Sequence, residues 1–212
     1  MSEQVPLLLL PGMMCDERLF TSQIATLSVD RDVQVLAMAD HDSVELLAES
    51  ILAQAPPVFA LAGLSMGGIV AMEIIRQAPH RVERLALLDT NPLAEREEVS
   101  ANRNIQISKV REGKLQSVMR DEMKPNYLSD GPNKAAILDL CMEMAGALGP
   151  KVFERQSRAL QTRPDQQGTL RNIDVPTLIL CGEDDSLRPP ERHQLMHDLI
   201  PHSILSIIPE AG

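Results

Sequence analysis

Short apolar runs alternate with segments of helical periodicity along this chain, and this alternation limits the possible folds more than any other feature. The first run, Val5–Leu10, is solidly apolar, as expected of a strand that is covered on both faces. The runs span residues 5–10, 33–37, 58–62, 85–88, 177–181 and 204–208. Strands that alternate with helices build βαβ units, so the pattern predicts an α/β fold with a mostly parallel sheet flanked by helices.

The clearest helix signal follows the second apolar run. Apolar side chains recur there at helical spacing from Val44 to Leu52, Ser43 suits the N-cap, and Pro56 ends the pattern. We expect further helices over residues 17–27, 66–77 and 190–200.

This rhythm breaks in the middle of the chain. Between about Asn91 and Asp174 the sequence is charged, helical in pattern and interrupted by prolines, among them Pro125. Because the βα rhythm resumes afterwards, an insertion into one domain fits better than a second domain. We therefore predict an α/β core over residues 1–92 and 175–212 and a helical cap over residues 93–174.

Composition narrows the classes of function. The 212 residues carry a formal net charge of −10, which argues against a nucleic-acid partner because Lys and Arg bind the phosphates. Val5–Leu10 is too short to span a bilayer and lacks a basic flank, so neither a membrane partner nor a signal peptide is expected. Cys15, Cys141 and Cys181 form no Cys-x-x-Cys pair, which predicts a cytoplasmic protein with reduced thiols and without a metal or other cofactor.

A serine lies where the third apolar run meets the following helix. The segment Gly63-Leu64-Ser65-Met66-Gly67 is a Gly-x-Ser-x-Gly motif, whose small residues allow a sharp strand-to-helix turn that exposes the serine oxygen. At a helix N-terminus, free backbone N–H groups and the helix dipole favour an anionic oxygen. Ser65 is therefore the predicted nucleophile, and the alternative is a turn of small residues without chemistry.

Attack by a serine on a carbonyl requires donors for the oxyanion and an acid that orients a base. The backbone N–H of Met66 follows the nucleophile, and the loop after the first run offers that of Met13, beside Gly12. Three carboxylates, Glu183–Asp185, follow the fifth run, and any of them could be the acid or only a solvated charge. Asp89 offers a second acid position at the same edge, although an Asp that starts a turn is the simpler interpretation.

At these residues the chain resembles the α/β-hydrolase superfamily, in particular its small esterases and lactonase-like members with a helical cap. Gly63–Gly67 looks like the nucleophile elbow, and Leu8–Met13 looks like the oxyanion loop, with Pro11-Gly12 in place of the family's frequent His-Gly. A strand that ends in Gly-x-x-Asp supplies the acid in such proteins, which implies Asp185. The resemblance implies a serine hydrolase of carboxylic esters, thioesters or lactones that forms an acyl-enzyme on Ser65.

The base of such a site departs from the family's pattern. Members place a Gly-His pair after the last strand, and the segment Ile208–Gly212 is similar to the lead-in to that pair. Two interpretations stay open: a shortened version of a longer protein, which we favour, or a natural chain without its base. The second would leave a non-catalytic small-molecule-binding protein. An uncovered sheet face at Ile204–Ile208 would then expose apolar surface and favour a homo-oligomer.

The five histidines of the chain are less suitable as a base. His80 and His202 lie in links that lead into strands, at the edge opposite Ser65. His193 and His197 are four residues apart on a helix and are expected at its surface. Only His41 follows a strand at the correct edge.

Overall fold

Six parallel strands form one sheet in the computed structural model, which describes residues 4–124 and 127–212. The strands are β1 (Leu7–Leu10), β2 (Val33–Val35), β3 (Phe59–Leu64), β4 (Val82–Leu88), β5 (Thr177–Gly182) and β6 (Ile204–Ile208). Their order is β2-β1-β3-β4-β5-β6, and each neighbouring pair is parallel. The predicted fold class is confirmed, while the predicted break at Pro125 lies outside the described residues.

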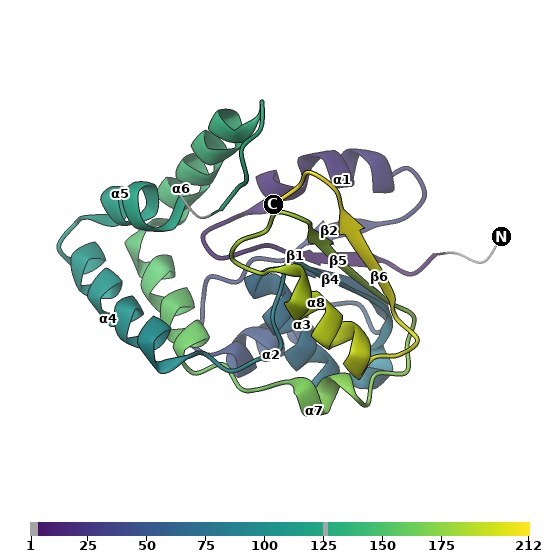
Figure 1. Cartoon of the computed structure of the whole chain (residues 1–212). Helices are drawn as coiled ribbons and strands as arrows, with labels where there is room; N and C mark the ends of the chain where they lie inside the picture. Colours follow the sequence, from purple (N-terminus) through teal and green to yellow (C-terminus); the bar gives the residue numbers. More distant parts are fainter. Residues whose placement is uncertain (1–3, 125–126) are drawn as a thin grey trace.

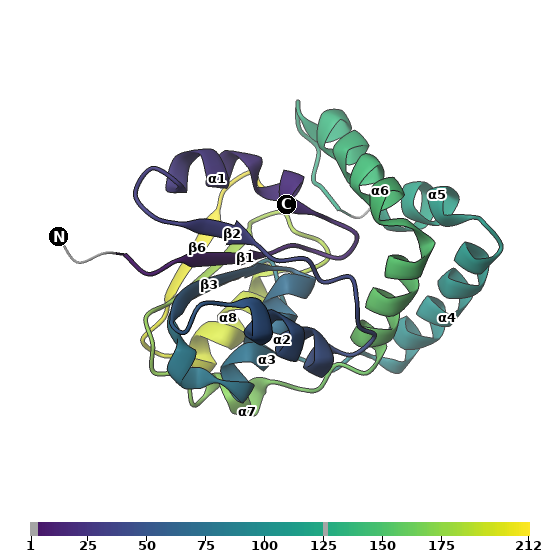
Figure 2. The ribbon, with the colours of Figure 1, turned by 180° about the vertical axis from the view of Figure 1, so that it is seen from behind.

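Helices cover both faces of this sheet (Figures 1 and 2). The 3-10 turn η1 (Glu17–Phe20) and α1 (Thr21–Leu27) lie on one face. The other face carries α2 (Val44–Gln54), α3 (Met66–Gln77), α7 (Gln167–Leu170) and α8 (Pro190–Leu199). A second 3-10 turn, η2 (Pro79–Arg81), leads into β4. The side chain of Ser43 caps α2 by accepting a hydrogen bond from the Leu46 amide, as the sequence predicts.

The alternation of side chains along β1 explains why an unbroken apolar run forms a strand. Leu8 and Leu10 are fully buried in the larger core, which includes α2, α3 and α8. Leu7 and Leu9 point the other way and pack in a second cluster with Phe20 of η1. Successive side chains of a strand face opposite sides of the sheet, so a strand covered on both faces needs apolar residues at every position.

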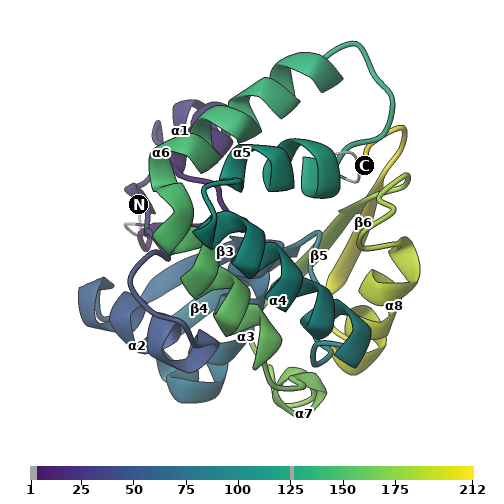
Figure 3. The same cartoon turned by 90° about the vertical axis from the view of Figure 1, so that its left-hand side faces the viewer.

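A helical segment lies at the edge where the parallel strands end (Figures 1 and 3). It comprises α4 (Glu97–Arg111), α5 (Leu115–Ser117), the π-helical turn η3 (Val118–Met123) and α6 (Lys134–Gln161). α6 is kinked at Gly149, where φ is 78° and Pro150 follows. Within the described part of residues 93–174 no strand occurs, and α7 packs against α3 and α8 of the core. The exact boundary of the predicted cap therefore stays a prediction.

β6 forms one edge of the sheet and is poorly covered. Ile204, Ile207 and Ile208 are 68%, 44% and 40% exposed.

In the described ranges, no helix is both long enough and apolar enough to cross a membrane.

Candidate active site

The nucleophile elbow is formed where β3 passes into α3. Ser65 is the N-cap of α3 and has a φ of 53° and a ψ of −109°, a region that residues with a side chain rarely adopt. Its amide donates to the carbonyl oxygen of Leu88 in β4 at 2.9 Å, and its own carbonyl accepts from Gly68 and Ile69 of α3. The side chain of this half-buried serine is thus presented at the N-terminus of a helix on a strained backbone.

The two outer glycines of the motif are required by close packing. A Cβ atom at Gly63 would lie 2.3 Å from the carbonyl oxygen of Gly67. A Cβ atom at Gly67 would lie 2.1 Å from the carbonyl oxygen of Leu10 in β1. Both distances are far below van der Waals contact, so only glycine permits α3 to start this close to the sheet.

Thr90, the second residue after β4, holds the backbone of the elbow by a hydrogen bond. Its hydroxyl donates to the carbonyl oxygen of Ser65 at 2.7 Å, and its amide donates to Nε2 of His193 at 3.2 Å. His193 is fully buried, so its expected place at the helix surface is wrong. Burial lowers the pKa of this imidazole. The spacing of His193, Met196 and Ile200, all buried, is a helical stripe that could have revealed this role.

The predicted oxyanion donors lie close to Ser65. Met66 follows it directly, and a Cβ atom at Gly12, next to Met13, would be 3.8 Å from Cβ of Ser65. Within the described part of the chain, neither the Met13 nor the Met66 amide donates a hydrogen bond to another protein group. Two free amides near one serine are what an oxyanion requires, although their role stays a prediction.

The oxyanion loop is anchored to α6. The amide of Met14, whose φ is 58°, donates to Oε1 of Gln156 at 2.8 Å. Nε2 of the same buried Gln156 donates to the carbonyl oxygen of Met38 at 2.9 Å. One side chain of the helical segment thus fixes both the loop after β1 and the segment after β2.

Cys15, which follows this loop, is not poised as a nucleophile. Its thiol donates to the carbonyl oxygen of Met13 at 3.6 Å. A hydrogen bond with the Cys141 thiol of α6 and burial raise the pKa of Cys15 well above its usual value. A thiol with a raised pKa is a poor nucleophile, which agrees with the packing role expected for this residue.

The two candidate acids follow neighbouring strands, Asp89 after β4 and Asp185 after β5. Oδ1 of Asp185 accepts hydrogen bonds from the amides of Leu187 and Arg188, both at 2.8 Å. Oδ1 of Asp89 accepts from the Gly182 amide at 3.0 Å. Burial, together with the neighbouring Asp185, raises the pKa of Asp89 to about 6. The simple turn role expected for Asp89 is therefore incomplete, because its carboxyl group also accepts from the backbone of β5.

The last residues of the chain pack on this acid loop. The amide of Asp184 donates to the carbonyl oxygen of Ala211 at 2.7 Å. A Cβ atom at Gly212 would lie 2.3 Å from the carbonyl carbon of Asp184, and one at Gly182 would lie 2.3 Å from the carbonyl oxygen of Ala211. Position 212 thus lies directly beside the loop that carries Asp185.

The structure pairs no histidine with the nucleophile or the acids by a hydrogen bond among the described residues. His202 contacts the carbonyl oxygen of Val175 at 3.0 Å, before β5, and His197 contacts the hydroxyl of Ser203 at 2.8 Å. Within the same described ranges, no group of three or more His, Cys, Asp or Glu residues is arranged to hold a metal ion.

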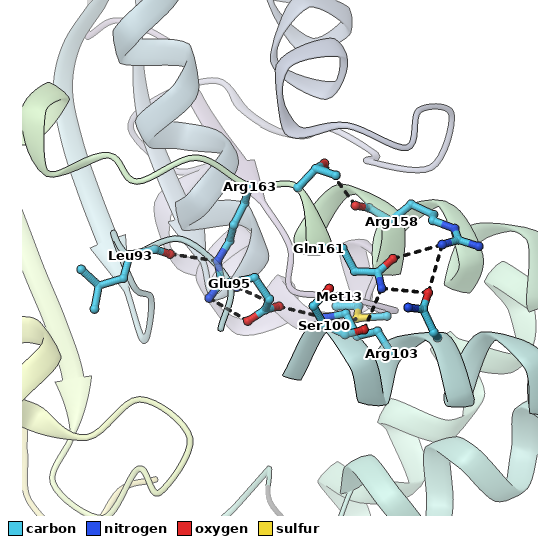
Figure 4. A network of polar contacts seen from close by, with 10 residues as sticks. Met13, Leu93, Glu95, Ser100, Arg103, Arg158, Gln161 and Arg163 are labelled. Carbon is cyan, nitrogen blue, oxygen red and sulfur yellow. Dashed lines mark hydrogen bonds and ion pairs between the residues drawn. The ribbon is translucent and has the colours of Figure 1, made fainter. Parts of the chain in front are cut away.

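A buried ionic network, which the sequence did not reveal, lies beside the oxyanion loop (Figure 4). Glu95 accepts from Nε of Arg103 at 2.8 Å and pairs with Arg163 at 3.1 Å. Nη1 of Arg103 reaches Sδ of Met13 at 3.7 Å. Burial lowers the pKa of Arg163 to about 10, although Glu95 opposes this shift. No local motif marks these residues, because they meet only in the fold.

Comparison with known proteins places this geometry in a family. Residues 32–211 match the family model described as serine aminopeptidase, S33. The pimeloyl-[acyl-carrier protein] methyl ester esterase of Nitrosospira multiformis is 27% identical over 175 residues, which cover 79% of this chain and 66% of that protein. The protein of the same name from Klebsiella pneumoniae is 30% identical, with 76% and 65% covered. The chain thus spans about two thirds of the length of these relatives.

Solved structures share the fold over almost the whole chain. A thermophilic esterase from Thermogutta terrifontis, solved with malate bound, superposes with a TM-score of 0.88 at 26% identity, covering 98% of this chain and 82% of that one. The enol-lactonase of Burkholderia xenovorans LB400 superposes with a TM-score of 0.88 at 19% identity, with 99% and 84% covered, which shows the fold alone. With the family model matching most of its length, the chain belongs to the serine aminopeptidase S33 family of the α/β-hydrolase superfamily.

Proposed function

We propose that this protein hydrolyses carboxylic esters through an acyl-enzyme on Ser65. The elbow carries this proposal: a strained serine at the start of α3, with two glycines that no other residue could replace. Backbone strain at a serine between a strand and a helix is typical of nucleophiles held ready for reaction. The esterases among the chain's relatives support the same reaction class.

In this reaction Oγ of Ser65 forms a bond to the ester carbonyl carbon while a base takes the hydroxyl proton. The carbonyl oxygen becomes an oxyanion, which the amides of Met13 and Met66 and the dipole of α3 stabilise. When the oxyanion collapses, the bond to the alcohol oxygen breaks and the base returns the proton to that oxygen. Water then attacks the acyl-enzyme by the same steps and releases the carboxylic acid and Ser65.

Asp185 is the acid that orients the base in this proposal. In this proposal a base that followed Gly212 would lie beside Asp185, because Ala211 and Gly212 lie against Asp184. Sequencing the gene beyond Gly212 tests this assignment. A histidine codon in the next position supports it, and a stop codon there contradicts it.

The helical segment α4–α6 serves as the cap of this site. A cavity of about 250 Å³ lies beside this segment, between the loop after β1, the end of β2 and α6, and its lining includes Cys15, Met38 and Gln156 but not Ser65. The exposed isoleucines of β6 support contact with a second copy, and the three free cysteines support a cytoplasmic location.

The direct test is labelling of Ser65 by a fluorophosphonate, combined with hydrolysis of p-nitrophenyl acetate and butyrate. The protein should include the residues that follow Gly212 in its gene, with Ser65→Ala as the matched control. We expect rapid stoichiometric labelling and ester hydrolysis, both lost in Ser65→Ala. Hydrolysis that survives Ser65→Ala, or a folded protein that neither labels nor hydrolyses, would contradict the proposal in favour of a binding protein.

A further inference from the structure

Buried positive charge gathers beside the oxyanion loop, in a protein whose formal net charge is −10. Arg103 and Arg163 have side chains that are 11% and 4% exposed, and they share the carboxylate of Glu95, which is 5% exposed. Arg188, from the loop between β5 and α8, contributes a third guanidinium group. A buried charge is tolerated when it is paired, and these three guanidinium groups outnumber the carboxylates of Glu95 and Asp185 that act on them.

The guanidinium group of Arg163 binds groups of the protein itself. Its Nε donates to the carbonyl oxygen of Leu93 at 3.0 Å, and its two terminal nitrogens reach Glu95 at 3.1 and 3.5 Å. The fork of this guanidinium therefore holds Glu95 in place, and each of its three nitrogens contacts an acceptor of the protein. Arg163 is a positioning residue.

Arg103 and Arg188 keep donors that lack a suitable acceptor. Nε of Arg103 binds Glu95, but its Nη1 reaches only the thioether sulfur of Met13, which is a weak acceptor. Nε of Arg188 is buried and has no hydrogen-bond partner among the described residues, while its Nη1 donates to the carbonyl oxygen of Leu187 at 2.8 Å. Both side chains thus retain capacity for an anionic ligand.

The two arginines act on one region of the site. The amide of Arg188 donates to Oδ1 of Asp185 at 2.8 Å, so Arg188 lies beside the proposed acid, and burial lowers the pKa of its guanidinium group. Arg103 is linked through the Met13 side chain to the loop whose neighbour, Gly12, lies against Ser65. Figure 4 shows Arg103 between Glu95 and Met13.

We propose that Arg103 and Arg188 form a subsite for a carboxylate group of the substrate. The inference rests on the proposed ester hydrolysis and specifies its substrate: an ester whose acyl part ends in a free carboxylate, several bonds from the carbonyl that Ser65 attacks. A guanidinium binds a carboxylate through two parallel hydrogen bonds and a full opposite charge. The subsite therefore selects half-esters of dicarboxylic acids over neutral esters of the same length.

Binding to the Ser65→Ala protein tests the subsite without any turnover. Isothermal titration calorimetry compares monomethyl glutarate, which has one carboxylate, with dimethyl glutarate, which has none. We expect the half-ester to bind at least tenfold more tightly, and we expect Arg103→Met or Arg188→Met in the same background to weaken it at least tenfold. Equal affinity for the two esters, or no loss in either arginine variant, would overturn the proposal.

Arg84→Met is the matched control for the loss of one positive charge. Arg84 is exposed and lies near the start of β4, at the opposite edge of the sheet from Ser65. We expect this variant to bind monomethyl glutarate like its parent. A loss equal to that in Arg188→Met would mean that net charge alone governs binding, which would overturn the subsite. Circular dichroism and thermal melting confirm that each variant is folded.

Hydrolysis of the same two esters separates this inference from the proposed function. If the protein with Ser65 hydrolyses both esters at the same kcat/KM, the subsite is wrong and the esterase assignment stands. If it hydrolyses neither but binds the half-ester through Arg103 and Arg188, the subsite stands and the esterase assignment is wrong. If the ratio of the kcat/KM values favours the half-ester and falls toward one in Arg188→Met, both the subsite and the esterase assignment are supported.

Discussion

The hydroxyl of Thr90 donates a hydrogen bond to the carbonyl oxygen of Ser65 at 2.7 Å. Thr90, the second residue after β4, thus holds the backbone of the nucleophile. The same Thr90 side chain faces Gly68 of α3, where a Cβ atom would lie 2.6 Å away. The elbow is therefore held between β1, which leaves no room for a side chain at Gly67, and Thr90 after the end of β4. The unusual φ of Ser65 can persist because the surrounding contacts leave the chain no other path.

Replacing Thr90 by valine tests the role of this hydrogen bond. Thr90→Val keeps the shape of the side chain but removes the donor to Ser65, so we expect the free energy of unfolding to fall by about 1–3 kcal/mol. Fluorophosphonate labelling of Ser65 should slow as well. Thr90→Ser, which keeps the hydroxyl, is the control. Equal stability and equal labelling rates for the valine and serine variants would exclude that role.

Gly67→Ala should prevent α3 from docking on the sheet. The new Cβ would lie 2.1 Å from the carbonyl oxygen of Leu10, and this backbone atom cannot move without disturbing β1. We expect a loss of more than about 3 kcal/mol in chemical denaturation, or no folded protein. Gly168→Ala in α7, whose Cβ would meet nothing within 4 Å, should change stability by less than about 1 kcal/mol. Similar losses in both would show that the close approach does not matter.

The carboxyl group of Asp89 predicts a pH dependence of stability. Its folded pKa, about 6, is above the ordinary value of 3.8, so the folded state binds the proton more tightly than the unfolded state. The stabilisation is full below the unfolded pKa and is lost as the pH rises through the folded pKa. Between pH 5.5 and pH 8 we expect the wild type to lose roughly 1 kcal/mol through this group.

Asp89→Asn should remove this loss, since an amide oxygen can still accept from Gly182 but does not ionise. Urea unfolding at pH 5.5 and pH 8 measures the difference between the variant and the wild type at each pH. We expect that difference to shift in favour of Asp89→Asn at pH 8, whereas Asp198→Asn, an exposed position on α8, should follow the wild type. A difference that is constant with pH would contradict the raised pKa.

The fold and the nucleophile were predictable because their signals are local. Each strand covered on both faces is an unbroken apolar run, and the elbow needs its small residues within five consecutive positions, Gly63–Gly67. His193 was assigned wrongly to the surface because its polar side chain outweighed its helical spacing with Met196 and Ile200, which places it on the buried side of α8. Only the fold reveals that its ring accepts from Thr90.

The ionic network could not be predicted for a related reason. Glu95, Arg103, Arg163 and Arg188 are dispersed over more than 90 positions of the chain, and each alone is typical of a solvated charge. Their burial follows from the packing of α4 and α6 against the loops at the strand ends.

Glu95 offers the sharpest test of the network that surrounds the site. Glu95→Gln removes the carboxylate that balances Arg103 and Arg163, and leaves two buried guanidinium groups without an opposite charge. We expect a loss of about 3–5 kcal/mol in urea unfolding, because breaking one side of a buried ion pair exposes the uncompensated partner charge. Arg163→Met alone should also destabilise the protein, since Leu93 loses its donor. The double variant Glu95→Gln/Arg163→Met should lose less than the sum of the two single variants, because removing one cation relieves the other. Additive losses would show that Glu95 and Arg163 do not act as a pair.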